Sequence, residues 1–404
     1  MHFTGLLGIV ALLAIAYAMS HNRKAINYRL VGWGLGLQLT FALLILKTPF
    51  GKPFFSIIDR LINKLLSFSD AGSDFLFKSF GMGVVEGPLL NFAFRVLPTI
   101  IFFSSLMAIL YHLGIMQWIV KWIARGMQKT LKTSGSETLS VSANIFVGQT
   151  EAPLMVRPYI SGMTKSELMA VMTGGFATVA GGVMAIYVKM LSDIPNIAGH
   201  LMAASIMSAP AALVIAKIIY PETEESMTAG DLKIDVKSDS DNSMEALAKG
   251  ATDGLKLAAN VGAMLIAFVA IIAMINSVLG LAGFSLQQIL GWIFSPLAWC
   301  MGAPWSEAQT LGMLMGEKIV LTELIAYADL SNFRTEQLIS ERTAIIASYA
   351  LCGFANFASI GIQLGGIGGI APERRKDLAK LGFRAMFGGA LASWLTATIA
   401  GIII

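Results

Sequence analysis

The chain has 404 residues, of which 55% are hydrophobic and 13% are charged, a composition typical of an integral membrane protein. Its 29 basic and 25 acidic residues are too evenly balanced and too scattered to indicate a nucleic-acid partner, and its two cysteines lack the short spacing of a metal or redox pair. Because each helical crossing needs about 20 apolar residues, the chain has room for roughly eight to ten crossings and little for a separate catalytic domain.

Eight apolar runs follow one another along the chain and predict eight membrane crossings. They lie near residues 4–19, 30–47, 90–118, 167–190, 197–219, 255–282, 341–365 and 378–404. Basic residues follow the first and third runs and precede the last one, and short basic loops usually face the cytoplasm. We therefore expect both termini on the outside of the membrane.

Two stretches between these runs have a different character. Residues 220–253 are hydrophilic and predict a solvated cytoplasmic linker between two halves of the chain. Residues 51–80 alternate apolar and polar positions, which favours helices that lie at the membrane interface.

Two polar segments stand where a membrane protein would ordinarily be apolar. Residues 138–159 contain Gly148, which permits a tight bend, and Pro153, which suits the first turn of a helix. Residues 304–327 contain several ionisable side chains, among them Glu323. An ionisable residue at membrane depth usually marks a functional site. Since residues 138–159 are too polar to cross the bilayer, we predict that they form a re-entrant hairpin. Residues 304–327 would form its partner from the other side, and the two tips would meet near the midplane.

The two halves of the chain repeat each other. Residues 175–181 (GFATVAG) match residues 353–359 (GFANFAS) in kind at nearly every position, and each copy follows an embedded acid, Glu151 or Glu323. Small and polar residues inside an apolar run are typical of a helix that breaks at mid-membrane. With the orientation above, the repeats are inverted, which indicates alternating access.

At these positions the sequence resembles the concentrative nucleoside transporters, and the resemblance extends over nearly the whole chain. It is carried by residues 148–154 (GQTEAPL), 354–359 (FANFAS), 94–98 (FRVLP) and 371–375 (APERR). It implies an all-α integral membrane protein with about eight transmembrane helices, interfacial helices, two broken helices and two re-entrant hairpins in an inverted repeat. The family also implies a homotrimer in the lipid bilayer of the bacterial inner membrane that imports nucleosides, such as uridine, together with sodium.

The resemblance divides the chain into a fixed scaffold and a moving transport part. Residues 1–120 and the helix at 254–282 would form the scaffold, and residues 121–253 and 283–404 would form the two transport halves. The nucleobase would contact Gln149, Thr150, Glu151, Val183 and Leu257. The ribose would contact Glu323, Asn356, Ser359 and Phe354. Sodium would be coordinated, mainly through backbone carbonyls, by Asn144, Val147, Thr178 and Val179.

Two positions depart from the pattern of the family. Thr322 stands where members often have Asn, and Thr178 stands where they often have Ser. Both replacements keep an oxygen, and Thr322 can still cap the helix that follows it. The cation preference stays open, because a buried carboxylate could carry a proton in place of sodium.

Three other interpretations compete with this one. The embedded acids Glu151 and Glu323 could be structural and pair with Arg157 or Lys318. An intramembrane hydrolase is disfavoured, because all four histidines lie near predicted span ends and no Ser or Cys nucleophile accompanies a base at a suitable spacing. An ion channel would line one continuous pore, whereas inverted hairpins favour a carrier.

Overall fold

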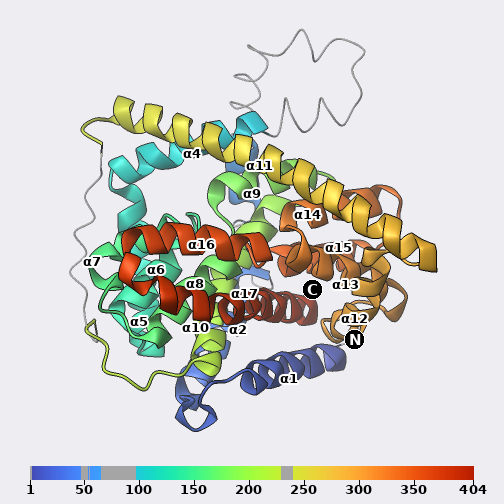
Figure 1. Ribbon diagram of the computed structural model, residues 1–404, viewed down its shortest axis with the longest axis horizontal. Coiled ribbons are helices and arrows are strands. Elements are labelled where there is room, and N and C mark those ends of the chain that lie inside the picture. The colour runs from blue at the N-terminus through green and yellow to red at the C-terminus, as the bar shows by residue number, and fades with distance from the viewer. Residues whose placement is uncertain (1, 47–52, 54, 65–96, 229–239) are drawn as a thin grey trace.

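The computed structural model describes residues 2–46, 53, 55–64, 97–228 and 240–404, and every regular element within these ranges is a helix (Figure 1). Four helical segments of this part are long and apolar enough to cross a membrane, or six if each of two bent helix pairs counts as one span. The segment that carries residues 94–96 and most of the predicted interfacial stretch at 51–80 lie outside the described residues, although residues 55–64 are helical.

Within the described residues, each of the eight apolar runs corresponds to a helix or to a pair of helices. The first half contains α1 (His2–Ala18), η1 (Arg23–Ala25), α2 (Tyr28–Leu46), α4 (Leu97–His112), α5 (Ile115–Leu131), α6 (Gly135–Ala143), η3 (Ala152–Val156), α7 (Arg157–Ile160), α8 (Lys165–Ala177), α9 (Gly181–Met190) and α10 (Ile197–Ile219). The second half contains α11 (Ser243–Leu279), η4 (Gly280–Ala282), α12 (Leu286–Cys300), α13 (Trp305–Val320), α14 (Glu323–Thr335), α15 (Glu341–Leu351), α16 (Phe357–Ile370), η5 (Pro372–Arg374) and α17 (Arg375–Ile403).

Helix α11 runs along one side of the molecule, next to α4 (Figure 1). Glycines allow this close approach, because a Cβ atom on Gly250 or Gly254 would lie only 2.7 Å from atoms of α4. The helix starts at Ser243, where Asn242 Oδ1 caps it by accepting a hydrogen bond from the Glu245 backbone N–H at 2.9 Å. The predicted linker at 220–253 was therefore too long, because its last eleven residues are helical in spite of their polar composition.

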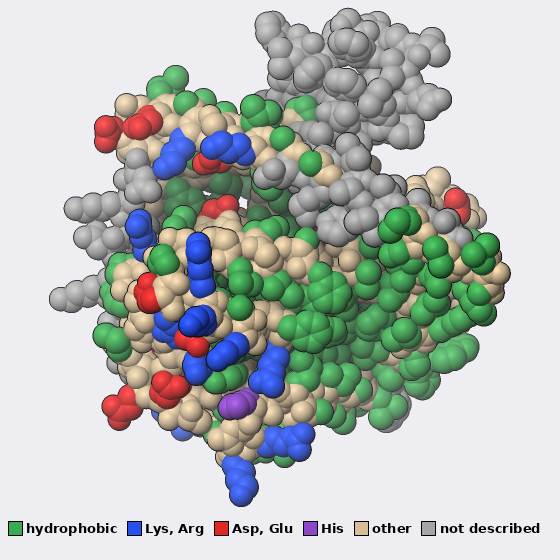
Figure 2. Space-filling model, viewed as in Figure 1, with side chains coloured by type: hydrophobic (Ala, Val, Ile, Leu, Met, Phe, Trp, Pro, Cys, Tyr) green, Lys and Arg blue, Asp and Glu red, His purple; other side chains and the backbone are tan. Residues whose placement is uncertain are grey.

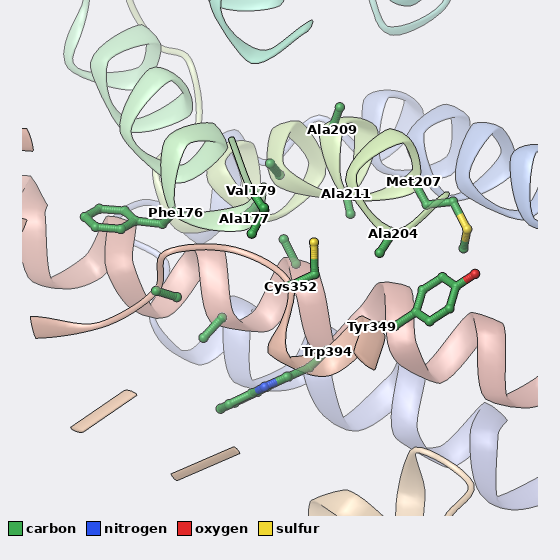
Figure 3. Packing of buried hydrophobic residues seen from close by; sticks show 14 of the residues in the cluster. Phe176, Ala177, Val179, Ala204, Met207, Ala209, Ala211, Tyr349, Cys352 and Trp394 are labelled. Carbon is green, nitrogen blue, oxygen red and sulfur yellow. The ribbon is translucent and has the colours of Figure 1, made fainter. Parts of the chain in front are cut away.

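The core of the protein lies where α8, α10, α15 and α17 pack together. A Cβ atom on Gly389 of α17 would lie 2.3 Å from the Phe176 Cβ atom of α8, so these two helices touch through their backbones. Figure 3 shows Ala177 and Val179 of the first half close to Cys352 of the second half, with Trp394 of α17 on the other side of Cys352.

Both predicted helix breaks are present, and they touch each other. The first lies between Ala177 and Gly181, and the second between Leu351 and Phe357. At the second break Gly353 has a φ of +101°, a conformation that favours glycine. A Cβ atom at this position would lie 2.5 Å from the carbonyl oxygen of Phe176, so any side chain would push the two breaks apart.

The two hairpins differ in their second arms. In hairpin 1, α6 begins with a capping box between Ser134 and Glu137, and the chain returns through η3, which has Pro153 in its first turn. In hairpin 2, α13 and α14 are both longer α-helices, and the Ile325 backbone N–H donates to Thr322 Oγ1 at 3.4 Å, which is the predicted cap.

The outer surface is consistent with a membrane environment. Figure 2 shows a broad apolar surface on one side of the molecule, while the charged side chains gather on the other side. On α12, for example, Trp292 and Ile293 are 51% and 62% exposed. Apolar patches of such extent normally face lipid or another protein chain.

Candidate substrate site

The carboxylate of Glu323 is held by two hydrogen bonds from different parts of the fold. The Tyr187 hydroxyl of α9 donates to Glu323 Oε1 at 2.9 Å, and Asn356 Nδ2 donates to Oε2 at 2.8 Å. Glu323 is the first residue of α14 and is 5% exposed. The acid at the tip of hairpin 2 is therefore fixed against both broken helices.

Asn356 has a second role as the N-terminal cap of α16. The Ser359 backbone N–H donates to Asn356 Oδ1 at 2.9 Å, so the amide oxygen faces the helix and its nitrogen faces Glu323. Ser359 then reaches the other hairpin, since its Oγ accepts a hydrogen bond from Gln149 Nε2 at 3.2 Å. The helix cap thus connects the tips of the two hairpins.

Gln363 of α16 completes this network. Its Nε2 donates to Gln149 Oε1 at 3.0 Å and to the Met172 carbonyl oxygen of α8 at 3.1 Å. Gln149 and Gln363 are 6% and 0% exposed. A buried, hydrogen-bonded polar network of this kind orients its members uniquely.

Sequence reasoning missed two members of the network, Tyr187 and Gln363. Gln363 left a signal, because it is the single amide side chain within the glycine-rich apolar run at 357–370. Tyr187 left none, since one tyrosine in an apolar helix is usually core packing.

A cavity of about 450 Å³ lies between α4, the tip of hairpin 1, α9 and α11. Its wall includes three residues that were predicted to contact the nucleobase, Glu151, Val183 and Leu257. Tyr111, which the sequence did not indicate, also lines it. Figure 2 shows the molecule hollowed beneath α11. Cavities of this volume accept small organic ligands.

The remaining predicted ligand contacts do not line this cavity. Thr150 packs on α16, because a Cβ atom on Gly366 would lie 2.6 Å from Thr150 Cγ2. Phe354 is half-buried against the core at the second break. Gly148 leaves room for the neighbouring acid, since a Cβ atom there would lie 2.2 Å from Glu151 Oε2.

The four residues predicted to bind sodium come from two segments that the structure brings together. The Gly181 backbone N–H donates to the Phe146 carbonyl oxygen at 3.0 Å, which attaches the hairpin 1 segment of Asn144 and Val147 to the break of Thr178 and Val179. The side chains of Val147, Thr178 and Val179 are buried at 8%, 1% and 1% exposure. Oxygen-rich, irregular backbone of this kind is where alkali cations bind in transporters.

Asn144 presents a buried side-chain oxygen of the kind that binds an alkali cation. It is 1% exposed, and its Nδ2 donates to the Ser140 carbonyl oxygen at 3.2 Å. Its Oδ1 is buried and has no hydrogen-bond partner within the described part of the chain. A buried acceptor without a partner costs about 1–3 kcal/mol, and a sodium ion would satisfy it.

The competing structural interpretation of the acids finds little support. Lys318, which was considered as a partner of Glu323, donates its three hydrogen bonds to the Ala350 and Cys352 carbonyl oxygens and to Ser393 Oγ. Among the ion pairs of the described residues, neither Glu151 nor Glu323 takes part. Both acids are placed for contact with a ligand or with polar neutral groups.

Two opposed hairpins, two broken helices in contact and a buried polar network define a helical membrane carrier. Three family models match the chain: "Na+ dependent nucleoside transporter N-terminus" over residues 7–80, "Nucleoside recognition" over residues 93–193 and "Na+ dependent nucleoside transporter C-terminus" over residues 200–401. The chain therefore belongs to the sodium-dependent, or concentrative, nucleoside transporter family. It is a transporter and not an enzyme, as the sequence predicted.

Relatives of known sequence and structure agree with this assignment. The uncharacterized transporter YutK of Bacillus subtilis is 46% identical over 99% of each chain. Sodium/nucleoside cotransporter 1 of Rattus norvegicus is 42% identical over 98% of this chain, which spans 63% of that longer protein. The transporter CNTnw is 44% identical to this chain. Its inward-facing substrate-bound structure matches all of this chain and 98% of its own, with a TM-score of 0.91. A variant of CNTnw in an outward-facing state matches all of this chain and 97% of its own, with a TM-score of 0.90. The predicted fold class is thereby confirmed.

Proposed function

We propose that this protein imports nucleosides together with sodium by alternating access. The observation that carries the proposal is the anchoring of Glu323 by Tyr187 and Asn356, which presents a buried carboxylate between the two hairpins and the two broken helices. The related sodium/nucleoside cotransporters support nucleosides as the substrate class. The inverted repeat supports alternating access as the mode of transport.

Glu323 is the proposed acceptor for the ribose hydroxyls. A carboxylate that accepts two neutral hydrogen bonds retains lone pairs, and hydroxyl donors to a charged acceptor form short, strong bonds. Asn356, Ser359 and Phe354 would complete the ribose contacts. A nucleoside without ribose hydroxyls would leave the buried acid under-satisfied, which is a basis for strong discrimination.

The nucleobase would occupy the 450 Å³ cavity. Val183 and Leu257 would form apolar walls, and the Glu151 carboxylate would accept from a donor on the edge of the base. Gln149 and Thr150 would contact the base only after the hairpin tip changes its contacts, because both are engaged with α16 in the present arrangement. This is consistent with a site that assembles around its ligand.

Sodium is the proposed coupling ion and would cross the membrane together with the nucleoside. The unpaired Asn144 Oδ1 and the carbonyl groups at Val147, Thr178 and Val179 would hold it. Proton coupling through Glu151 or Glu323 is the alternative. The sodium-dependent nucleoside transporters to which this chain is related favour sodium.

The arrangement in the membrane follows from the same proposal. The protein would be a homotrimer in a bacterial inner membrane with both termini outside. Residues 1–120 and α11 would form the scaffold. The two segments that carry the hairpins, 121–253 and 283–404, would move against this scaffold. The start of α11, which falls within the first segment, would belong to the scaffold. The cavity lies between these two parts, since α4 and α11 form one wall and hairpin 1 and α9 form the other.

The test is uptake of labelled uridine by proteoliposomes with an inward sodium gradient, an inward proton gradient or neither. We expect accumulation with sodium alone, and weak competition by free uracil compared with uridine. Accumulation with protons alone would reassign the coupling, and equal competition by uracil and uridine would contradict the ribose contacts.

A further inference from the structure

Helix α5, which leads into hairpin 1, exposes tryptophans and cations on the same face. Trp118 and Trp122 are 65% and 58% exposed, and Arg125 and Lys129 are exposed as well. These four residues are three or four positions apart, so they lie on one side of the helix. The opposite side is apolar and buried, and it consists of Met116, Val120, Ala124, Met127 and Leu131.

The exposed side chains are ordered along the axis of α5. The two tryptophans come first and meet edge to face with their ring centroids 6.4 Å apart, and the Arg125 guanidinium lies 5.7 Å from the centroid of the Trp122 ring. Among the ion pairs of the described residues, none involves Arg125 or Lys129. Tryptophan favours the boundary between hydrocarbon and headgroups, and neighbouring cations there attract anionic lipids.

The position of α5 in the fold fits such a boundary. Its axis is bent by 76° from that of α4, which belongs to the third predicted crossing, so α5 lies close to the membrane plane. The Gly135 backbone N–H, just beyond α5, donates to the Thr228 carbonyl oxygen at 3.0 Å. Lys132, which caps α5, lines a cavity together with Asn27 of the first basic loop and Glu222. The end of α5 therefore lies beside the first basic loop and the start of the linker, both of which we expect in the cytoplasm.

Helix α12 is the counterpart of α5 in the second half of the chain. It follows α11 at a bend of 79°, precedes hairpin 2 and exposes Trp292, but it contains no charged residue. A Cβ atom on Gly401 would lie 2.5 Å from the Met301 carbonyl oxygen at the end of α12, so this helix ends near the C-terminus. Figure 1 shows α12 beside the N-terminus and α5 on the opposite side of the molecule. Exposed tryptophan is thus common to both helices, whereas cations are present only on the helix beside the linker.

Helix α5 is also attached to the moving part of the proposed carrier. It spans the proposed boundary between scaffold and transport part at residue 120, ends at Leu131 and is followed by α6, the first arm of hairpin 1, which begins at Gly135. The two helices touch, since Ser142 Oγ of α6 lies 3.6 Å from Met127 Sδ of α5. A ligand that fixes α5 at the membrane surface therefore also fixes the outer end of hairpin 1.

We propose that α5 binds anionic phospholipids of the cytoplasmic leaflet, with Arg125 and Lys129 at the phosphate groups and Trp118 and Trp122 between the headgroups and the acyl chains, and that this contact holds the outer end of hairpin 1 during transport. The choice of leaflet rests on the proposed orientation. The lipid contact itself depends neither on the transported substrate nor on the coupling ion.

The first test is native mass spectrometry of the protein in detergent, titrated with phosphatidylglycerol or phosphatidylcholine. We expect tighter binding of phosphatidylglycerol, and no competition by glycerol 3-phosphate, which has the charge without the acyl chains. Each basic residue near an anionic membrane contributes about fivefold to binding, so the double variant Arg125→Gln/Lys129→Gln should bind phosphatidylglycerol roughly 25-fold more weakly. Its binding of phosphatidylcholine and its melting temperature should not change, because both side chains are exposed.

The matched control removes two other exposed charges four residues apart. Lys376→Gln/Lys380→Gln on α17 does so in a helix turn without tryptophan and should retain phosphatidylglycerol binding. An equal loss in this control would overturn the inference, because it would reveal attraction by surface charge in general. Unchanged binding by the α5 variant, or competition by glycerol 3-phosphate, would overturn it as well. A change of oligomeric state of the α5 variant in size-exclusion chromatography would mean that this face contacts another copy of the chain instead.

The second test is uridine uptake by proteoliposomes of phosphatidylcholine with and without phosphatidylglycerol. We expect the anionic lipid to change the rate of uptake by the unmodified protein and by the α17 control, but not by the α5 variant. A variant that loses lipid binding and still responds to phosphatidylglycerol would refute the effect on hairpin 1. If no nucleoside is transported, the proposed function fails, whereas the mass spectrometry still decides whether α5 binds anionic lipid.

Discussion

Glu323 is the residue at which a change of a single atom should matter most. Both of its oxygens accept hydrogen bonds, from Tyr187 and from Asn356, so a glutamine would turn an NH₂ group toward one donor whichever way its amide points. Hydrogen bonds to charged groups contribute about 1.5–3 kcal/mol, which corresponds to a loss of roughly 10-fold to 150-fold in affinity. We expect Glu323→Gln to lose uridine binding by this factor in isothermal titration calorimetry.

A matched control is available in the same hairpin. Glu307 Oε2 accepts from the Ser340 hydroxyl at 2.9 Å in an exposed position, away from both breaks. Glu307→Gln should therefore transport uridine normally. Normal transport by Glu323→Gln as well would remove Glu323 from the site.

A substitution of Asn144 should affect sodium binding without affecting nucleoside binding. Replacing it by alanine removes the unpaired Oδ1 but leaves the backbone carbonyls in place. We expect Asn144→Ala to raise the sodium concentration for half-maximal uptake about tenfold, which corresponds to about 1.4 kcal/mol, and to change uridine affinity little at saturating sodium. Ser142→Ala is the control on the same hairpin arm, since Ser142 Oγ contacts Met127 Sδ at 3.6 Å. An unchanged sodium dependence of Asn144→Ala would exclude the side chain as a ligand.

At the scale of elements, the sequence predicted the features that depend on short stretches of residues. Hydrophobic runs, embedded acids and the small polar stretches at the breaks are all visible in short windows, and the structure contains the corresponding helices, hairpins and breaks. The start of α11 at Ser243 was missed because its first turns are polar, although Asn242 caps it and Gly250 and Gly254 let it approach α4 closely. Tyr187 and Gln363 were missed because their partners lie more than a hundred residues away along the chain.

The contact between the two breaks makes Gly353 a sensitive position. An alanine there would carry the strain of a positive φ, about 1–3 kcal/mol, and its Cβ would lie 2.5 Å from the Phe176 carbonyl oxygen. We expect Gly353→Ala to lower the melting temperature in detergent and to reduce uptake. The control is Gly365→Ala on α16, where a Cβ atom would meet nothing within 4 Å and helix propensity should improve stability by up to about 1 kcal/mol. Equal melting temperatures for the two variants would mean that the breaks can separate freely.

At the scale of the whole molecule, the orientation in the membrane is set by the distribution of basic loops, and it can be tested from the two sides. Asp241 precedes the cap of α11 and is exposed, and Ile404 at the end of the chain is 37% exposed. In a background without Cys300 and Cys352, Asp241→Cys should react with a membrane-impermeant maleimide in inverted vesicles and not in intact cells. Ile404→Cys should react in intact cells. The reverse pattern would mean that the termini face the cytoplasm and would contradict the proposed orientation.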